Sequence, residues 1–149
     1  MLGGGGFRTP LVFRALLDDV AEPRVTEVVL HDVDRGRLDA IGLVLAQLAT
    51  GRADAPSVSV TNDLAVALDG ADFVFSAIRV GGLDGRVGDE RVALDLGLLG
   101  QETTGPGGIA FGLRTVPAAL HVAEEVVRRC PGAWVINFTN PAGMITEAM

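Results

Sequence analysis

The stretch GGGGFRTP (residues 3–10) lies at the start of the chain and decides how the rest of it is arranged. Four consecutive glycines give a backbone that can turn tightly and let a phosphate approach its N–H groups. Thr9 is a good N-cap and Pro10 a good first helical residue, and the apolar spacing that follows predicts a helix over residues 10–20. Free N–H groups at a helix N-terminus favour an anion. The stretch is therefore typical of the phosphate-binding end of a dinucleotide fold.

The glycine fingerprint of such folds is matched incompletely here. Gly3 and Gly5 fit its first two glycines, but the third position falls on Arg8,. A flexible glycine-rich N-terminus is therefore the alternative interpretation of this stretch.

Composition limits the classes of partner and compartment. The chain has 149 residues, is 48% hydrophobic and carries a net charge of −7, and all 12 of its basic residues are arginine. This acidity argues against nucleic acid or an anionic membrane as a partner. The lone cysteine, Cys130, permits no internal disulfide,. No signal peptide and no apolar run of about 18 residues is visible, so we expect a cytoplasmic protein.

Strand and helix patterns alternate along the rest of the chain, which predicts an α/β fold with a doubly wound parallel sheet. This is the Rossmann-like arrangement of lactate and malate dehydrogenases. Short β-branched or apolar runs predict strands at 27–32, 58–61, 71–78 and 134–138,. Helical spacing predicts helices at 35–50 and 63–68, and a long helix through 109–127,.

The two ends of the chain suggest a fold that is truncated at both. The central strand of this topology should precede the glycines, where only Met1 and Leu2 stand, and a new helix begins at Pro141 shortly before the last residue. We expect the neighbouring strands to be left with unpaired backbone groups. Residues 1–149 should then form an NAD-binding domain that either has low stability or self-associates, and we expect a homo-oligomer.

Asp32 follows the second strand of the predicted fold. A carboxylate there can accept hydrogen bonds from the ribose hydroxyls of an adenosine and would repel a 2′-phosphate. It lies 26 residues after Gly6, somewhat more than the usual spacing of about 20. The alternative is that Asp32 only caps the next helix, a role for which Asp34 is better placed.

A glycine-rich segment over residues 78–90 follows the next strand and is predicted to be a loop at the carboxyl edge of the sheet, where ligands bind,. Its two arginines, Arg79 and Arg86, suggest an anionic ligand, because a guanidinium group grips phosphate or carboxylate. The alternative is that Arg86 pairs with Asp89 or Glu90 at the surface.

Two further polar segments lie at the predicted sheet edge. The loop 100–108 contains a single acid, Glu102, which has no evident role in a helix or strand. Asn140 follows the last strand and offers both a donor and an acceptor. The alternative for Asn140 is an N-cap of the final helix.

Together these stretches resemble the NAD-dependent glycoside hydrolase family 4, and within it the 6-phospho-β-glucosidases. The resemblance covers nearly the whole chain in order. It is carried by the stretches LGGGGFRTPLV (2–12), EVVLHDVD (27–34), IRVGGLDGRVGDE (78–90), LGLLGQETTGPGG (96–108) and INFTNPAGMITEA (136–148). Each stretch alone is weak, but the five together are specific.

The resemblance implies hydrolysis of a phosphorylated β-glucoside or disaccharide by oxidation at C3, elimination, water addition and re-reduction, with NAD and a divalent metal, Mn²⁺, as cofactors. It assigns cofactor contacts to Gly3, Gly5, Gly6, Phe7, Arg8, Asp32, Arg79 and Asn140. Arg86 and Asn140 would contact the phosphorylated sugar. Glu102 matches an acid that tunes the catalytic base, which in this family is a tyrosine.

The chain departs from the family pattern in what it lacks. It contains no tyrosine, and the family's metal-binding Cys and His lie beyond the NPAG motif, so no metal ligand is assigned to this chain. We therefore expect residues 1–149 alone to be inactive. The alternatives are an NAD-dependent oxidoreductase like lactate or malate dehydrogenase, and a non-catalytic nucleotide-binding fragment.

Overall fold

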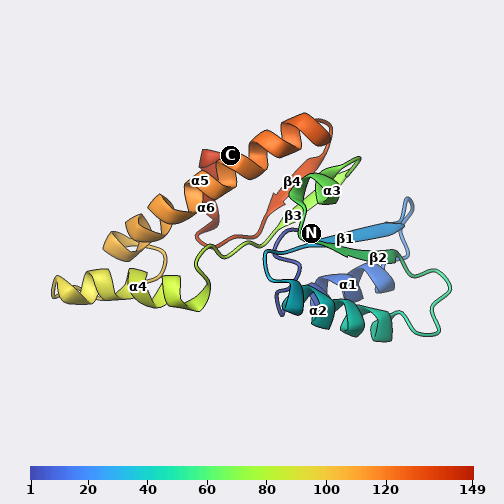
Figure 1. The fold of residues 1–149 in the computed structure, drawn as a ribbon, viewed down its shortest axis with the longest axis horizontal. Helices are drawn as coiled ribbons and strands as arrows, with labels where there is room; N and C mark the ends of the chain where they lie inside the picture. The colour runs from blue at the N-terminus through green and yellow to red at the C-terminus, as the bar shows by residue number, and fades with distance from the viewer.

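The computed structural model describes residues 1–149 and is an α/β fold built on parallel strands (Figure 1). In chain order its elements are α1 (Thr9–Asp18), β1 (Glu27–His31), α2 (Arg35–Leu48), β2 (Ser57–Thr61), α3 (Leu64–Leu68), β3 (Phe73–Ser76), α4 (Gly82–Asp95), α5 (Gly105–Arg129), β4 (Trp134–Asn137) and α6 (Ala142–Ala148).

The strands form two parallel pairs that meet at the N-terminus of the chain. β1 pairs with β2, from Glu27 opposite Ser57 onward, and β3 pairs with β4. Leu2 bridges both pairs, because it lies in parallel bridges to His31 and to Ser76. The order across the sheet is therefore β2, β1, Leu2, β3 and β4. This order confirms the predicted doubly wound sheet, with Met1 and Leu2 in its central position.

Met1 and Leu2 pair with the strands on both sides. The Leu2 N–H donates to the Phe75 carbonyl at 2.8 Å, and the Leu2 carbonyl accepts from the Ala77 N–H at 2.9 Å. On the other side the Met1 carbonyl accepts from the His31 N–H at 2.9 Å. The expectation that both neighbouring strands are left unpaired is therefore wrong at their carboxyl ends, which is where the glycine loop begins.

Each pair of strands has its own apolar core. Phe13, Leu17, Leu30, Leu38 and Leu45 are buried between α1, β1 and α2. A second cluster joins Leu2 to buried residues of α3, β3 and α5. In Figure 1, α1 and α2 accordingly lie against β1 and β2, whereas α5 runs beside β3 and β4.

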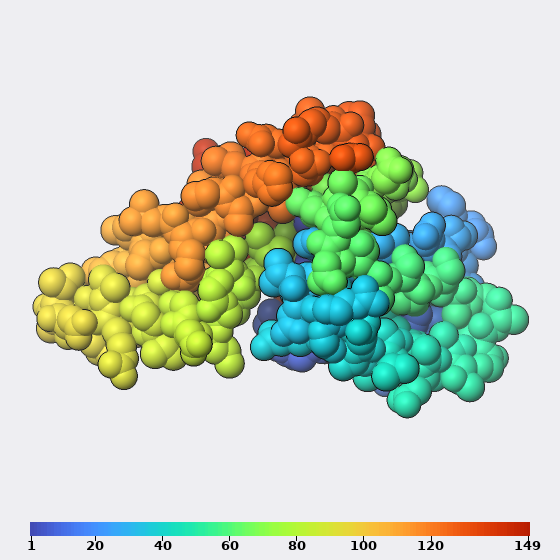
Figure 2. All heavy atoms as spheres, viewed as in Figure 1, coloured from blue at the N-terminus to red at the C-terminus, as the bar shows by residue number.

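Helix α4 corrects the prediction of a loop over residues 78–90, because only residues 77–81 connect β3 to a helix that runs to Asp95. Gly81 and Gly82 have positive φ values, of 80° and 59°, which end the connection and turn the chain into the helix,. Leu83 and Val87 of α4 are exposed, and the helix buries only Asp89 and Ala93, so no buried apolar stripe marks it. Figure 2 shows α4 and the start of α5 projecting away from the rest of the molecule.

The N-cap of α2 agrees with the sequence prediction, whereas that of α1 does not. Asp34 caps α2 by accepting from the Arg37 N–H at 3.0 Å. Helix α1 instead has Arg8 at its N-cap, and Thr9 is the first helical residue and is buried, so the prediction of Thr9 as the cap is wrong. None of the helices combines the length and the apolar character that crossing a bilayer requires.

Candidate functional site

The glycine loop lies between the carboxyl ends of β1 and β3. A Cβ atom on Gly3 would lie 2.5 Å from the Ala77 carbonyl oxygen, and one on Gly4 would lie 2.8 Å from the Leu30 Cβ. Gly3 also has a φ of 74°, so both its space and its conformation require glycine. The strand order reverses at this point of the sheet, which is where dinucleotides bind in such folds.

Asp32 points its carboxylate at this loop. Its Oδ2 accepts from the Gly5 N–H at 3.1 Å, and its Oδ1 accepts from the Asp34 N–H at 3.2 Å. Asp34, and not Asp32, caps α2, and the Asp32 carboxylate lies at the loop. This places an acid beside the glycines at the end of β1, as the sequence predicts.

Phe7 and Arg8 extend this group toward the end of β4. The Arg8 guanidinium lies 5.1 Å from the centroid of the Phe7 ring and 5.4 Å from that of Phe138. Asn140 follows Phe138 by two residues and is exposed, and its side chain has no hydrogen-bond partner within the chain. The glycine loop and the segment after β4 therefore face the same region.

A second group joins Arg79, Arg86 and Glu102. Glu102 lies between the two arginines: its Oε1 is 2.9 Å from the Arg79 Nη1, and its Oε2 is 3.4 Å from the Arg86 Nη2. Arg86 also donates through Nε to the Glu90 Oε1 at 2.9 Å. The bond to Glu90 and the charge of Glu102 raise the pKa of the Arg86 guanidinium above its usual value, so it stays charged.

These contacts answer the alternative for Arg86 that the sequence leaves open. The surface pair with Glu90 does form, at the i,i+4 spacing of a helix,. Asp89 does not take part in it. Arg86 also contacts Glu102, which the sequence did not indicate. The Glu102 side chain is 18% exposed, less than the 34% of Glu90.

Asp89 and Arg114 form a buried ion pair that sequence reasoning missed. Asp89 is 3% exposed, and both of its carboxylate oxygens accept from Arg114 at 2.6 Å. The Arg114 Nε donates to the Val80 carbonyl at 3.0 Å. Gly81 and Gly85 leave room for this side chain, since a Cβ on either would lie about 3 Å from it,. The sequence pattern that could have predicted this pair is the four-residue spacing of Gly81, Gly85 and Asp89. It can be recognised only when α4 is known to be a helix.

The histidine beside Asp32 is half-buried. Burial is the main cause that lowers the pKa of His31, and its Nδ1 is buried without a hydrogen-bond partner. The chain brings no three His, Cys, Asp or Glu side chains together in a metal-binding arrangement.

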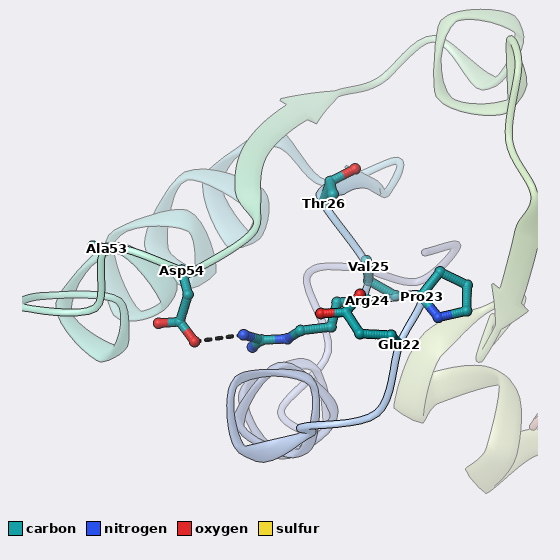
Figure 3. Close-up of a pocket in the computed structure, with 8 residues that line it drawn as sticks. Glu22, Pro23, Arg24, Val25, Thr26, Ala53 and Asp54 are labelled. Atoms are coloured by element: carbon teal, nitrogen blue, oxygen red, sulfur yellow. Dashed lines mark hydrogen bonds and ion pairs between the residues drawn. The ribbon is translucent and has the colours of Figure 1, made fainter.

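A shallow cavity of about 460 Å³ lies at the opposite edge of the sheet, at the amino ends of β1 and β2. It is lined by residues 22–26 and 53–55, and the ion pair of Arg24 Nη1 with Asp54 Oδ2 crosses it at 2.5 Å (Figure 3). Because ligands of open parallel sheets bind at the carboxyl edge, this cavity is not the candidate site.

Comparison with known proteins identifies relatives over the full length of the chain. Residues 1–149 match the model of the family described as "Family 4 glycosyl hydrolase". The chain is 45% identical over 151 residues to a 6-phospho-beta-glucosidase of Escherichia coli, and the match covers 99% of this chain and 33% of that protein.

Solved structures agree with this match. A 6-phospho-beta glucosidase of Thermotoga maritima, solved with manganese, NAD⁺ and glucose-6-phosphate, superposes with a TM-score of 0.89 at 36% identity, over 98% of this chain and 35% of that one. A 6-phospho-alpha-glucosidase from gut microorganisms, solved with NAD and Mn²⁺, gives a TM-score of 0.87 at 37% identity, over 99% and 34% of the two chains. The chain thus spans about a third of the length of these proteins.

A more distant likeness confirms the fold type. The lactate dehydrogenase of Cryptosporidium parvum superposes with a TM-score of 0.60 at 24% identity, over 99% of this chain and 39% of that one. At this identity the likeness concerns the fold alone.

Proposed function

Because this chain belongs to the family 4 glycosyl hydrolases, we propose that residues 1–149 are the NAD-binding part of a 6-phospho-β-glucosidase. The 45% identity to a β-specific relative supports the β form, and the alternative is the α form, at 37% identity to a solved α-specific structure. An oxidoreductase resembling lactate dehydrogenase is supported only by the shared fold. The substrate would be a β-glucoside phosphorylated on its 6-hydroxyl.

The glycine loop fits the proposed NAD. The loop lies at the carboxyl edge of the sheet, and Gly3 and Gly4 let its backbone pack against the ends of β3 and β1. In this proposal Gly3, Gly5, Gly6 and Phe7 contact the cofactor together with Arg8, Asp32, Arg79 and Asn140.

Three polar residues at the carboxyl edge of the sheet are assigned to the sugar. Arg86 would hold the 6-phosphate, Asn140 would hydrogen-bond the sugar, and Glu102 would act near the reacting carbons. NAD and a divalent cation, when bound, would supply the reversible oxidation at C3 that permits elimination and water addition. Residues 1–149 contain no tyrosine and no clustered metal ligands, so we place neither the base nor the metal on them.

The observation that carries the proposal is the Asp32 carboxylate, held beside the glycine loop by the Gly5 N–H. It should favour NAD over NADP, because a 2′-phosphate would meet a negative charge there. Isothermal titration calorimetry with both dinucleotides tests this: NAD should bind more tightly, and Asp32→Ala should weaken NAD binding. Equal affinity of the unaltered chain for the two dinucleotides would reject this role of Asp32.

A further inference from the structure

Glu102 lies between two guanidinium groups, the position that a phosphate would take. Its two oxygens are divided between the Nη1 atom of Arg79 and the Nη2 atom of Arg86, at 2.9 and 3.4 Å. Arg79 precedes α4, Arg86 lies on it and Glu102 follows it, so the carboxylate joins both ends of this helix.

The charges of this group are already balanced inside the chain. Arg79 and Arg86 supply two positive charges, and Glu90 and Glu102 supply two negative charges within the same contacts. A phosphate dianion that takes both Nη groups of Arg86 would displace Glu102, because Glu90 is bound to the Nε atom instead. Glu90 is a neighbour of Arg86 on one helix, whereas Glu102 reaches Arg86 from another segment and at the longer distance.

The backbone around Glu102 is held in place by close packing. A Cβ on Gly107 would lie 2.3 Å from the Gln101 carbonyl oxygen, and one on Gly108 would lie 2.8 Å from that of Thr103. The backbone on either side of Glu102 is thus packed against the start of α5. Release of Arg86 would therefore come from the Glu102 side chain and not from movement of its backbone.

We propose that Glu102 is a specificity residue that occupies Arg86 until the phosphate of the substrate displaces it. This inference rests on the proposed function and adds an exchange of anions to it. A doubly charged phosphate has more charge and more acceptor oxygens than a carboxylate, so it takes the guanidinium. A neutral sugar does not, and Glu102 then stays paired with Arg86 and away from the reacting carbons.

Glucose 6-phosphate binding to the 149-residue chain in the presence of NAD tests the exchange. Glu102→Gln removes the competing charge and keeps the shape of the side chain, so it should bind glucose 6-phosphate about two- to fivefold more tightly, the range expected for one partly exposed ion pair. Its affinity for glucose should not change. A residue that only supports the fold, or only contacts the sugar, would give weaker binding when altered.

The matched control is Asp84→Asn, which removes one negative charge from an exposed position of α4 two residues before Arg86. Asp84 makes no contact with Arg86, so affinity for glucose 6-phosphate should stay within twofold of the unaltered chain, about 0.4 kcal/mol. Equal tightening in both variants would mean a general charge effect and would overturn the exchange. Circular dichroism checks the fold of each variant, and Glu102→Ala serves as the second variant if Glu102→Gln is unfolded.

Arg86→Ala separates failure of the exchange from failure of the proposed function. If it abolishes binding while Glu102→Gln does not tighten it, the phosphate site stands and the exchange is rejected. If Arg86→Ala leaves the affinity unchanged, or if no variant binds glucose 6-phosphate, both the phosphate role of Arg86 and the exchange are rejected.

Discussion

Gly3 shows how closely one residue joins the glycine loop to the sheet. Its φ is 74°, and an added Cβ would lie 2.5 Å from the Ala77 carbonyl oxygen. Gly3→Ala should therefore destabilise the chain in two ways, through the left-handed conformation, at about 1–2 kcal/mol, and through the clash, at about 1–3 kcal/mol. Urea unfolding followed by circular dichroism measures the sum.

Gly51→Ala is the matched control for this prediction. Gly51 has a similar φ of 78° but nothing within 4 Å of an added Cβ, so only the conformational part, about 1–2 kcal/mol, should be lost. If the two variants lose equal stability, the contact between the loop and the end of β3 is looser than the structure shows.

At the scale of elements, the Asp89–Arg114 pair is what fixes α4 to α5. Helix α4 packs mainly on α5 and projects from the sheet (Figure 1). Asp89→Asn would leave Arg114 without its anionic partner in a partly buried position. Since breaking a buried pair costs about 3–5 kcal/mol and Arg114 retains 29% exposure, we expect a loss of about 2–4 kcal/mol in the free energy of unfolding.

Glu90→Gln, at the next residue, serves as the control because it breaks an exposed pair on a single helix. Such pairs contribute about 0.3–0.5 kcal/mol. Urea unfolding compares the two variants, and hydrogen exchange should show faster exchange of α4 amides in Asp89→Asn only. A loss below 1 kcal/mol in Asp89→Asn, about twice the upper value for the exposed pair, would mean that other contacts hold the helix.

The contrast between α2 and α4 shows which elements the sequence predicts. Leu38 and Leu45 lie at helical spacing and are buried, and Asp34 caps the helix, so α2 is predicted to within two residues of its end. Helix α4 buries only Asp89 and Ala93, and its ion pair is made with Arg114, which is distant in the sequence. The position of Asp32 beside the glycines could be predicted, because the strand pattern before it is visible in the sequence. The pairing of Glu102 with Arg79 and Arg86 could not, because it depends on the path of the chain between α4 and α5.

At the scale of the whole molecule, Met1 and Leu2 hold the two halves of the sheet together. Leu2 is 2% exposed and belongs to the core around β3 and α5, whereas Met1 packs against the core around α1 and β1. The Met1 amino group donates to the Val29 carbonyl oxygen at 2.6 Å inside this junction. A group that can carry charge therefore lies where the two cores meet.

This burial makes the stability of the 149-residue chain depend on pH. Burial lowers the pKa of the Met1 amino group from its usual 8.0 to about 6. Below pH 6 the amino group is charged in the folded and the unfolded chain, and the folded chain bears the cost of burying that charge. Between pH 6 and 8 the folded chain has lost the proton that the unfolded chain still binds, so the free energy of unfolding should rise with pH, by about 2–3 kcal/mol in total. His31, whose pKa is also lowered by burial, adds a rise of the same sign up to its usual pKa of 6.5.

Urea unfolding at pH 6 and pH 8 measures the difference, and acetylation of the amino group should remove the Met1 part and leave that of His31. Stability that is constant or falls between these two pH values would show that the amino group is exposed to solvent and does not lie between the two halves of the sheet.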